Sequence, residues 1–220
     1  MVPAAVFWDT CLVVSDTLAA LKTDIETAIR ILREGGVVCM PTDTLYALTA
    51  PATAPNAVVR VYKIKGRELD KPLPLFVSDA AMAGRISEVT PMARRLMDRF
   101  WPGALTVVVP RKQSFDSLAL SGGDTIALRV PDNGIARRII EAAGVPVTAT
   151  SANLSGGANP STAQEVERQI GDGIDYLLDG GECEVGLPST IVDCTGERPV
   201  ILREGAVSLE AIEAALAEEA

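Results

Sequence analysis

The chain has 220 residues, 48% of them hydrophobic, and carries a formal net charge of −9 from 20 basic and 29 acidic residues. Its length favours one domain over two, because no linker-like change of composition divides it. The acidic balance opposes a sequence-independent grip on nucleic acid, which needs a basic surface. The chain has no histidine, which excludes a Ser-His-Asp triad, a Cys-His dyad, histidine-ligated zinc and an imidazole base.

Targeting signals are weak throughout the sequence. No apolar run approaches the roughly 18 residues that a membrane span needs. The apolar N-terminal stretch MVPAAVFWDTCLVV has no basic region and is interrupted by Asp9, so we expect no secretory signal. The cysteines Cys11, Cys39, Cys183 and Cys194 form no CxxC pair and sit in apolar or loop surroundings, which is typical of buried thiols in a reducing compartment. We therefore expect a cytoplasmic protein without membrane contact.

The first half of the chain alternates predicted helices and strands. Capping-box spacing at Thr23 and Glu26 predicts the start of a helix that ends at Gly35. Two prolines, Pro72 and Pro74, favour an extended segment after the next helix. The predicted elements are a helix over 23–34, a strand over 37–40, a helix over 56–64, an extended segment over 72–77, a helix over 91–100 and a strand over 105–109.

The second half continues the same alternation. A second capping box, Thr162 with Glu165, begins a helix, and Ser208 caps the last one. The other predicted elements are a strand over 125–130, a helix over 135–143, an extended start over 145–147, and strands over 176–178 and 190–192. Helices and strands intermingle to the end without a repeat, which indicates an α/β (α+β) fold with a mixed sheet covered by helices.

Cations gather in the segment VYKIKGRELDKPLPL, residues 61–75. If this segment is extended, Lys65 and Arg67 project to one side and hold one anion between them, while Gly66 leaves the backbone approachable. Lys71 lies four positions further on. Arginine offers phosphate a bidentate fork and lysine a mobile point charge. The alternative is a solvated charged loop paired with its own carboxylates, and for this segment alone that alternative is the better one.

Hydroxyls and an amide gather in TATSANLSGG, residues 148–157, after a short apolar strand. Ser151 and Asn153 share one side of this segment, at a strand end where open α/β sheets place their ligands. Ordinary turn chemistry explains the same composition about equally well. No GxxxxGK[ST] and no GxGxxG after a strand is present, so any nucleotide must be held by cations and hydroxyls.

Further polar residues lie on predicted strands. The alternation of TIALRVP places Thr125 and Arg129 on one face, and an arginine there is at a sheet edge, ion-paired, or a ligand for a carboxylate or phosphate. Ser189 precedes the strand over 190–192, and Arg203 leaves another strand. Taken singly, these residues are more often structural than functional.

The motifs together resemble the YrdC/TsaC family of L-threonylcarbamoyladenylate synthases. The segments that carry the resemblance are, in order, PTDTLYAL, KGRELDKPL, WPGALTVVV, TIALRVPD, TSANLSG, PSTIVD and LREGA. The family signature KxR followed by SxN corresponds to Lys65, Arg67, Ser151 and Asn153. The resemblance implies a single YrdC-like domain over residues 1–220, with its core at about 23–205. It also implies a YrdC/RibB-like twisted mixed sheet flanked by helices, with a basic concave cleft.

The resemblance also implies a reaction. L-threonine, bicarbonate or CO₂, and ATP would give threonylcarbamoyl-AMP and pyrophosphate, and a partner complex would transfer the threonylcarbamoyl group to tRNA as the t6A modification, with weak direct tRNA contact. The implied catalytic residues are Lys65, Arg67, Ser151 and Asn153. L-threonine would contact Thr44, Arg129, Ala149 and Ser189. ATP would contact Lys65, Arg67, Lys71, Thr125, Ser151, Asn153, Ser161 and Arg203. Mg²⁺ would be carried by ATP, with no metal held by the protein.

The sequence departs from the family pattern at two positions. Ala47 stands where the family usually has glycine, and Glu68 stands where proline often follows KxR. The sequence also lacks the C-terminal domain of longer family members, whose linker covers the nucleotide, so we expect a more open cleft. Two alternatives are a non-catalytic RNA-binding module and a carbamoyl-transfer domain of the hydrogenase-maturation type.

Overall fold

The computed structural model describes the backbone of residues 6–217 and the side chains of residues 20–217. The helices are α1 (Val6–Arg33), α2 (Pro55–Lys65), α3 (Ala80–Ile86), α4 (Pro91–Phe100), α5 (Gly134–Ala143), α6 (Ala163–Ile170) and α7 (Leu209–Ala217), with 3-10 turns η1 (Leu118–Leu120) and η2 (Gly171–Gly173). The strands are β1 (Val38–Met40), β2 (Ala47–Thr49), β3 (Leu75–Phe76), β4 (Leu105–Pro110), β5 (Thr125–Arg129), β6 (Val147–Thr148), β7 (Thr150–Ser151), β8 (Tyr176–Leu177), β9 (Thr190–Asp193) and β10 (Val200–Arg203).

The strands form two mixed sheets. The smaller has the order β7-β2-β1-β8 and the larger β10-β9-β4-β5-β3-β6. Each contains parallel and antiparallel pairs, such as β1 with β8 and β1 with β2. An isolated bridge between Pro51 and Val147 joins the two sheets. The predicted α/β fold with helices around mixed strands is confirmed, although the strands divide into two sheets.

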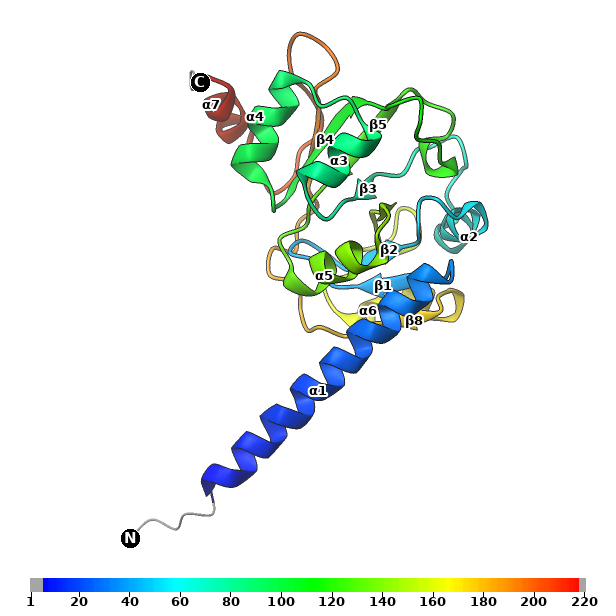
Figure 1. Cartoon of the computed structure of the whole chain (residues 1–220), viewed down its shortest axis with the longest axis vertical. Helices are drawn as coiled ribbons and strands as arrows, with labels where there is room; N and C mark the ends of the chain where they lie inside the picture. Colours follow the sequence, from blue (N-terminus) through cyan, green and yellow to red (C-terminus); the bar gives the residue numbers. More distant parts are fainter. Residues whose placement is uncertain (1–5, 218–220) are drawn as a thin grey trace.

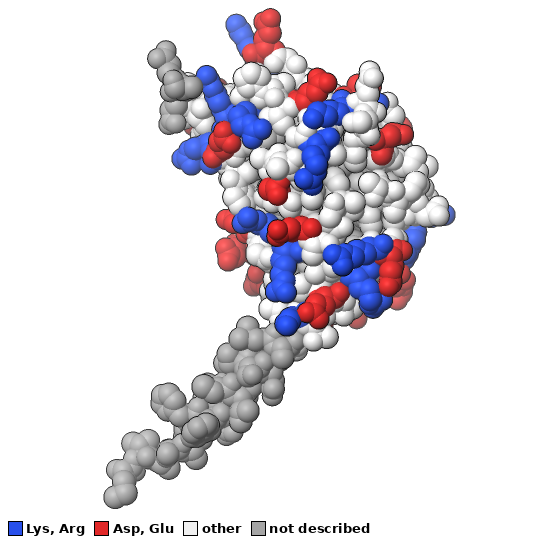
Figure 2. Space-filling view, viewed as in Figure 1, with Lys and Arg blue, Asp and Glu red and all other residues white. Residues whose placement is uncertain are grey.

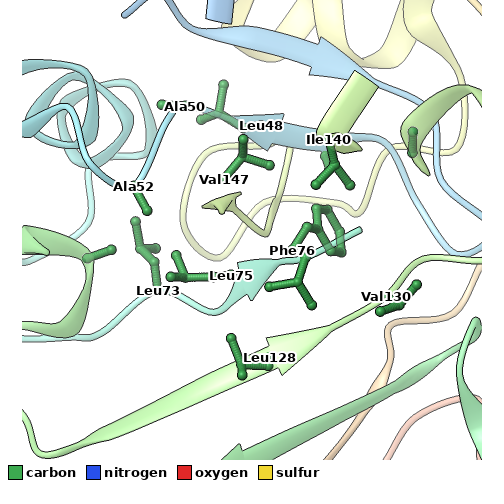
Figure 3. Packing of buried hydrophobic residues seen from close by; sticks show 14 of the residues in the cluster. Leu48, Ala50, Ala52, Leu73, Leu75, Phe76, Leu128, Val130, Ile140 and Val147 are labelled. Carbon is green, nitrogen blue, oxygen red and sulfur yellow. The ribbon is translucent and has the colours of Figure 1, made fainter. Parts of the chain in front are cut away.

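Apolar side chains from both sheets meet in one core (Figure 3). Leu48 of β2, Leu75 of β3, Leu128 of β5 and Val147 of β6 are all fully buried. Burying each such side chain contributes about 1.5–3 kcal/mol relative to leaving it exposed. The core therefore fixes the two sheets against each other, and with them the loops that line the site described below.

Helices cover the outside of this core (Figure 1). The end of α1 packs on α5, α4 packs on β4, and α7 packs on α4. Within residues 6–217, no helix combines the length and the apolar character that crossing a membrane requires. Cys39, Cys183 and Cys194 are free and buried, as predicted, whereas the side chain of Cys11 lies outside the described residues.

The predicted start of the first helix at Thr23 is wrong. Helix α1 already begins at Val6, so Thr23 is an interior position. The residues just before it, DTLAALK, contain no proline or glycine to stop a helix, and several of them are strong helix formers. The capping box at Thr162 and the cap at Ser208 are confirmed by hydrogen bonds from the backbone three residues on.

Candidate active site

A cavity of about 630 Å³ is lined by residues of both sheets. Its charged lining residues are Lys65, Arg67, Arg129 and Arg203, and no aspartate or glutamate lines it among the residues that the structure describes. A concave site with charges of one sign focuses its field and attracts counter-ions. The cavity therefore suits anionic ligands, although the whole chain is acidic.

Lys65 is the last residue of α2, and its side chain is buried. Its Nζ donates to the carbonyl oxygens of Ser151 at 2.7 Å and Asn153 at 2.9 Å, and to Oδ1 of Asn153 at 3.0 Å. Three acceptors satisfy the three N–H groups of an ammonium. The pKa of Lys65 is lowered from 10.5 to about 8, mainly by burial and to a smaller extent by the charge of Arg67.

The predicted extended Lys65-Gly66-Arg67 arrangement is wrong. Helix α2 continues through Lys65, and Gly66 then adopts the left-handed conformation, with φ of 58°, that ends the helix. Arg67 turns back over the loop, with Nε donating to the Lys71 carbonyl at 3.2 Å and Nη2 to the Pro72 carbonyl at 3.0 Å. Both cations still line the cavity, so a helix end and its turn bring them together.

Two predicted ATP ligands lie outside the cavity lining. The Nζ of Lys71 is 2.6 Å from Oε2 of Glu68, and the lysine side chain is 59% exposed. Ser161 is held by Glu165, whose Oε2 accepts from the serine N at 2.7 Å and from its Oγ at 3.3 Å. Both side chains are engaged by neighbouring carboxylates and do not face the cavity.

Ser151 and Asn153 share one side, as their spacing predicts. Ser151 Oγ donates to Asn153 Oδ1 at 2.6 Å, and Asn153 Nδ2 donates to the Gly157 carbonyl at 2.9 Å. The backbone N of Ser155 also donates to the carbonyl of Lys65 at 2.8 Å. The loop after β7 thus wraps around the end of α2, and its polar atoms and Lys65 hold one another in place.

Arg129 ends β5 with its guanidinium buried. Its Nε donates to the Gly103 carbonyl at 2.8 Å, Nη1 to Thr44 Oγ1 at 2.8 Å, and Nη2 to Asp43 Oδ1 at 2.5 Å. Its carbon Cζ also stands 5.7 Å from the ring centre of Phe76. Burial lowers the pKa of Arg129, and Asp43 acts in the opposite direction. Of the alternatives open for this arginine, the ion pair is the one observed.

Ser189 and Arg203 lie side by side in the lining of the cavity. Arg203 donates from Nε and Nη2 to the Ser189 carbonyl at 3.1 and 2.7 Å, and from Nη2 to Ser189 Oγ at 3.1 Å. The Ser189 hydroxyl also lies 2.8 Å from Oγ1 of Thr106, and both hydroxyls are buried. A connected hydroxyl pair therefore accompanies this second arginine.

The remaining predicted residues, Thr125 and Ala149, also line the cavity. Sequence reasoning missed Thr106 and Asn159, which line it, and Asp43, which supports Arg129. Asp43 lies in PTDTLYAL and Thr106 in WPGALTVVV, two of the segments that carry the family resemblance. Neither residue type by itself indicates a functional position. Only the fold shows which polar side chains turn toward the cavity or support a residue that lines it.

Comparison with known proteins identifies the family. The family model for Sua5, YciO and YrdC, described as "Telomere recombination", matches residues 30–205. The chain belongs to the Sua5/YciO/YrdC family. A threonylcarbamoyl-AMP synthase from Bacillus subtilis is 38% identical over 92% of this chain and 59% of its own length. One from Vibrio vulnificus is 31% identical over 84% of this chain and 100% of its own length.

A solved structure from the Sua5/YciO/YrdC family agrees with the fold. Sua5 of Pyrococcus abyssi in complex with L-threonine superposes with a TM-score of 0.84 and 38% identity, covering 88% of this chain and 57% of that chain. This chain therefore spans less than two thirds of the length of the Bacillus and Pyrococcus relatives. The family resemblance read from the sequence is confirmed.

The two residues that depart from the family pattern, Ala47 and Glu68, are compatible with the backbone around them. Ala47 lies in β2, paired with Met40 and Ser151, and it is not among the residues with positive φ. A regular strand position does not need glycine. Glu68 is exposed and forms the ion pair with Lys71. At neither position does the backbone require the residue that the family usually has.

Proposed function

We propose that this chain is an L-threonylcarbamoyladenylate synthase, an adenylyl-transferring enzyme that uses L-threonine, bicarbonate or CO₂, and ATP. The observation that carries the proposal is the cavity lined by Lys65, Arg67, Arg129 and Arg203 and, among the described residues, by no carboxylate. A triphosphate, a carbamate and an amino-acid carboxylate are all anions, and they would need such a lining. The names of the family relatives support the same reaction.

We assign the threonine side to the end of the cavity at Arg129. Thr44 Oγ1 and the guanidinium lie within hydrogen-bonding distance of each other, and Ser189 and Ala149 line the same cavity. The complex of the Pyrococcus protein with L-threonine supports an amino-acid site in this fold.

We assign ATP to the end of the cavity at Lys65. Ser151 and Asn153 contact that lysine, and Arg67 follows it in the chain. Thr125 and Arg203, which line the same cavity, complete the proposed ATP ligands. Lys71 and Ser161 belong to the same proposal and would have to release Glu68 and Glu165 to reach the nucleotide. No cluster of three or more metal-ligating side chains occurs in the described part of the chain, so we propose that Mg²⁺ arrives on the triphosphate.

The chemistry then depends on position and charge. The neutral amine of threonine attacks CO₂, forms the N–C bond and loses a proton, which gives a carbamate. A carbamate oxygen attacks the α-phosphorus of ATP, and the bond to the leaving pyrophosphate breaks. Fixed cations stabilise the charge that develops on both groups, and bound geometry replaces a chance encounter. This scheme requires no histidine. We further propose that the product passes to a tRNA-modifying complex.

The two alternatives rank lower. On the face shown in Figure 2, lysine and arginine alternate with aspartate and glutamate, which does not favour a long polyanion there. A carbamoyl-transfer domain would bind a carbamoyl donor and would not need free threonine.

The predicted cytoplasmic location stays a prediction.

The test is pyrophosphate release by the purified chain with ATP, Mg²⁺, L-threonine and bicarbonate. We expect release only when both threonine and bicarbonate are present. Equal release without threonine would contradict the synthase. Tight tRNA binding that weakens steeply with salt, without turnover, would instead support the RNA-binding module.

A further inference from the structure

Asp43 is a buried carboxylate that stands beside the cavity without lining it. Its Oδ1 lies 2.5 Å from Nη2 of Arg129 and accepts from the backbone N of Asp132 at 3.1 Å. Its own carbonyl accepts from the backbone N of Val185 at 3.0 Å. Asp43 is therefore fixed through both its side chain and its backbone, in contact with one arginine of the site.

The hydrogen bonds of Arg129 leave part of its guanidinium available. An arginine has five N–H donors, and those to Gly103, Thr44 and Asp43 use one each on Nε, Nη1 and Nη2. Among the described contacts, one N–H on each terminal nitrogen then has no partner. Terminal guanidinium N–H groups form strong charge-assisted hydrogen bonds with carboxylate oxygens.

We propose that Asp43 is the positioning residue for recognition of the amino-acid carboxylate. It holds the Arg129 guanidinium in one orientation, so that the two remaining N–H groups serve the α-carboxylate of the substrate. It also stabilises the charged form of an arginine that burial would otherwise disfavour. Asp43 acts through Arg129 and does not touch the substrate. This inference rests on the proposed function, because it assumes an amino acid at this end of the cavity.

The chain contains a matched pair away from the cavity. Asp175 Oδ2 lies 2.6 Å from Nη1 of Arg60 and accepts from the backbone N of Val37 at 2.8 Å. As with Asp43, the carboxylate pairs with an arginine and accepts from a backbone N–H. This second pair is more exposed and has two contacts, one to each carboxylate oxygen, and neither Asp175 nor Arg60 lines the cavity. Asp175→Asn therefore reports what losing such an ion pair does to the protein in general.

The experiment measures how well the full chain distinguishes L-threonine from L-threoninamide, which lacks the carboxylate, by calorimetric binding. We expect the wild type and Asp175→Asn to bind L-threonine more tightly than L-threoninamide. In Asp43→Asn the ratio of the two affinities should fall about tenfold, roughly the value of one charge-assisted hydrogen bond. A purely structural role would weaken both ligands equally. If Asp43→Asn does not fold, Asp43→Glu is measured in its place. This variant keeps the negative charge but displaces the guanidinium, so we expect the same loss of preference for L-threonine.

The outcomes separate the two proposals. A wild type that binds neither ligand, or both equally, contradicts the proposed function. A wild type that prefers threonine, together with an unchanged preference in the Asp43 variant, overturns the positioning role alone. A comparable loss of preference in Asp175→Asn would also overturn it, because the effect would then be general.

Discussion

Lys65 and Asn153 are 88 positions apart in the sequence, yet Nζ of Lys65 donates to both the backbone and the side-chain oxygen of Asn153. One lysine thus fixes the loop after β7 while it lines the cavity with its charge. The two halves of the family signature therefore form one physical unit. Substituting either half should disturb both.

Lys65→Ala should reduce pyrophosphate release about 100-fold, because fixed electrostatic donors in active sites typically contribute 10²–10³. Lys63→Ala is the matched control, since Lys63 lies on the same helix, is exposed, and does not line the cavity. Circular dichroism should show that both variants fold. A Lys65 variant that retains full turnover, or one that simply unfolds, would count against its assigned role.

The lowered pKa of Lys65 predicts how stability depends on pH. The folded chain releases this proton at about 8 and the unfolded chain near 10.5, so the unfolded state binds more protons between these values and stability rises with pH there. From pH 8 to 9 the contribution should be about 1 kcal/mol. Urea unfolding of wild type and Lys65→Met measures it, and we expect the wild type to gain about this much stability relative to the variant over that range.

The upper limit of that pH range matters. Burial raises the pKa of Cys194 from 9.0 to about 12, and burial also raises the pKa of Cys39. The unfolded chain begins to lose these protons from about pH 8 while the folded chain keeps them, so the thiols lower stability as the pH rises and oppose Lys65. The comparison therefore uses the difference between the wild type and Lys65→Met, in which the thiol contributions cancel, at pH 9 and below. A Lys65→Met variant with the same slope as the wild type would contradict the lysine as its source.

Gly205 should tolerate no side chain. A Cβ there would overlap the carbonyl oxygen of Pro188 and would lie 2.5 Å from the carbonyl carbon of Ser189. Gly205→Ala must therefore displace the backbone that presents Ser189 to the cavity, at a stability cost of about 1–3 kcal/mol. We expect a lower unfolding midpoint and weaker threonine binding.

Gly196→Ala is the control for Gly205. The space beside Gly196 is open, since the nearest atom to an added Cβ is 3.9 Å away. That variant should unfold within about 1 kcal/mol of the wild type, on the stabilising side if anything. Equal behaviour of the two alanine variants would show that the close approach at Gly205 is relaxed without consequence.

Arg67→Ala should raise the KM for ATP more than the KM for L-threonine. Arg67 lines the cavity and holds the turn at Lys71 and Pro72 through two carbonyls. Arg60→Ala removes a cation of the preceding helix that is paired with Asp175 outside the cavity, and both KM values should stay unchanged. An Arg67 variant with a selective defect for threonine would reverse the assignment of the two ends of the cavity.

Much of the architecture follows from local sequence patterns. Helices α4 and α6 have an apolar stripe and a clear cap, and β4 is long enough to show a run of buried residues. By contrast, β7 has only two residues, too few for any periodicity to register. Such strands exist because a neighbouring strand offers hydrogen bonds, which is a tertiary effect.

The site also combines features that the sequence predicts with features that only the folded chain shows. The KxR and SxN residues could be named from the sequence, but their geometry could not, because it depends on Gly66 taking a left-handed conformation. Asp43 and Thr106 could not be named at all. Each is polar within a buried segment, and only the folded chain shows that one supports Arg129 and the other Ser189.

The central claim is that this cavity joins threonine, the carbon of bicarbonate, and AMP. The most direct measurement is mass spectrometry of the product formed from ¹³C-bicarbonate, L-threonine and ATP by the wild type and by Lys65→Ala. We expect threonylcarbamoyl-AMP with one labelled carbon from the wild type, and little from the variant. AMP and pyrophosphate without a labelled threonylcarbamoyl adduct, or equal product from both proteins, would contradict it.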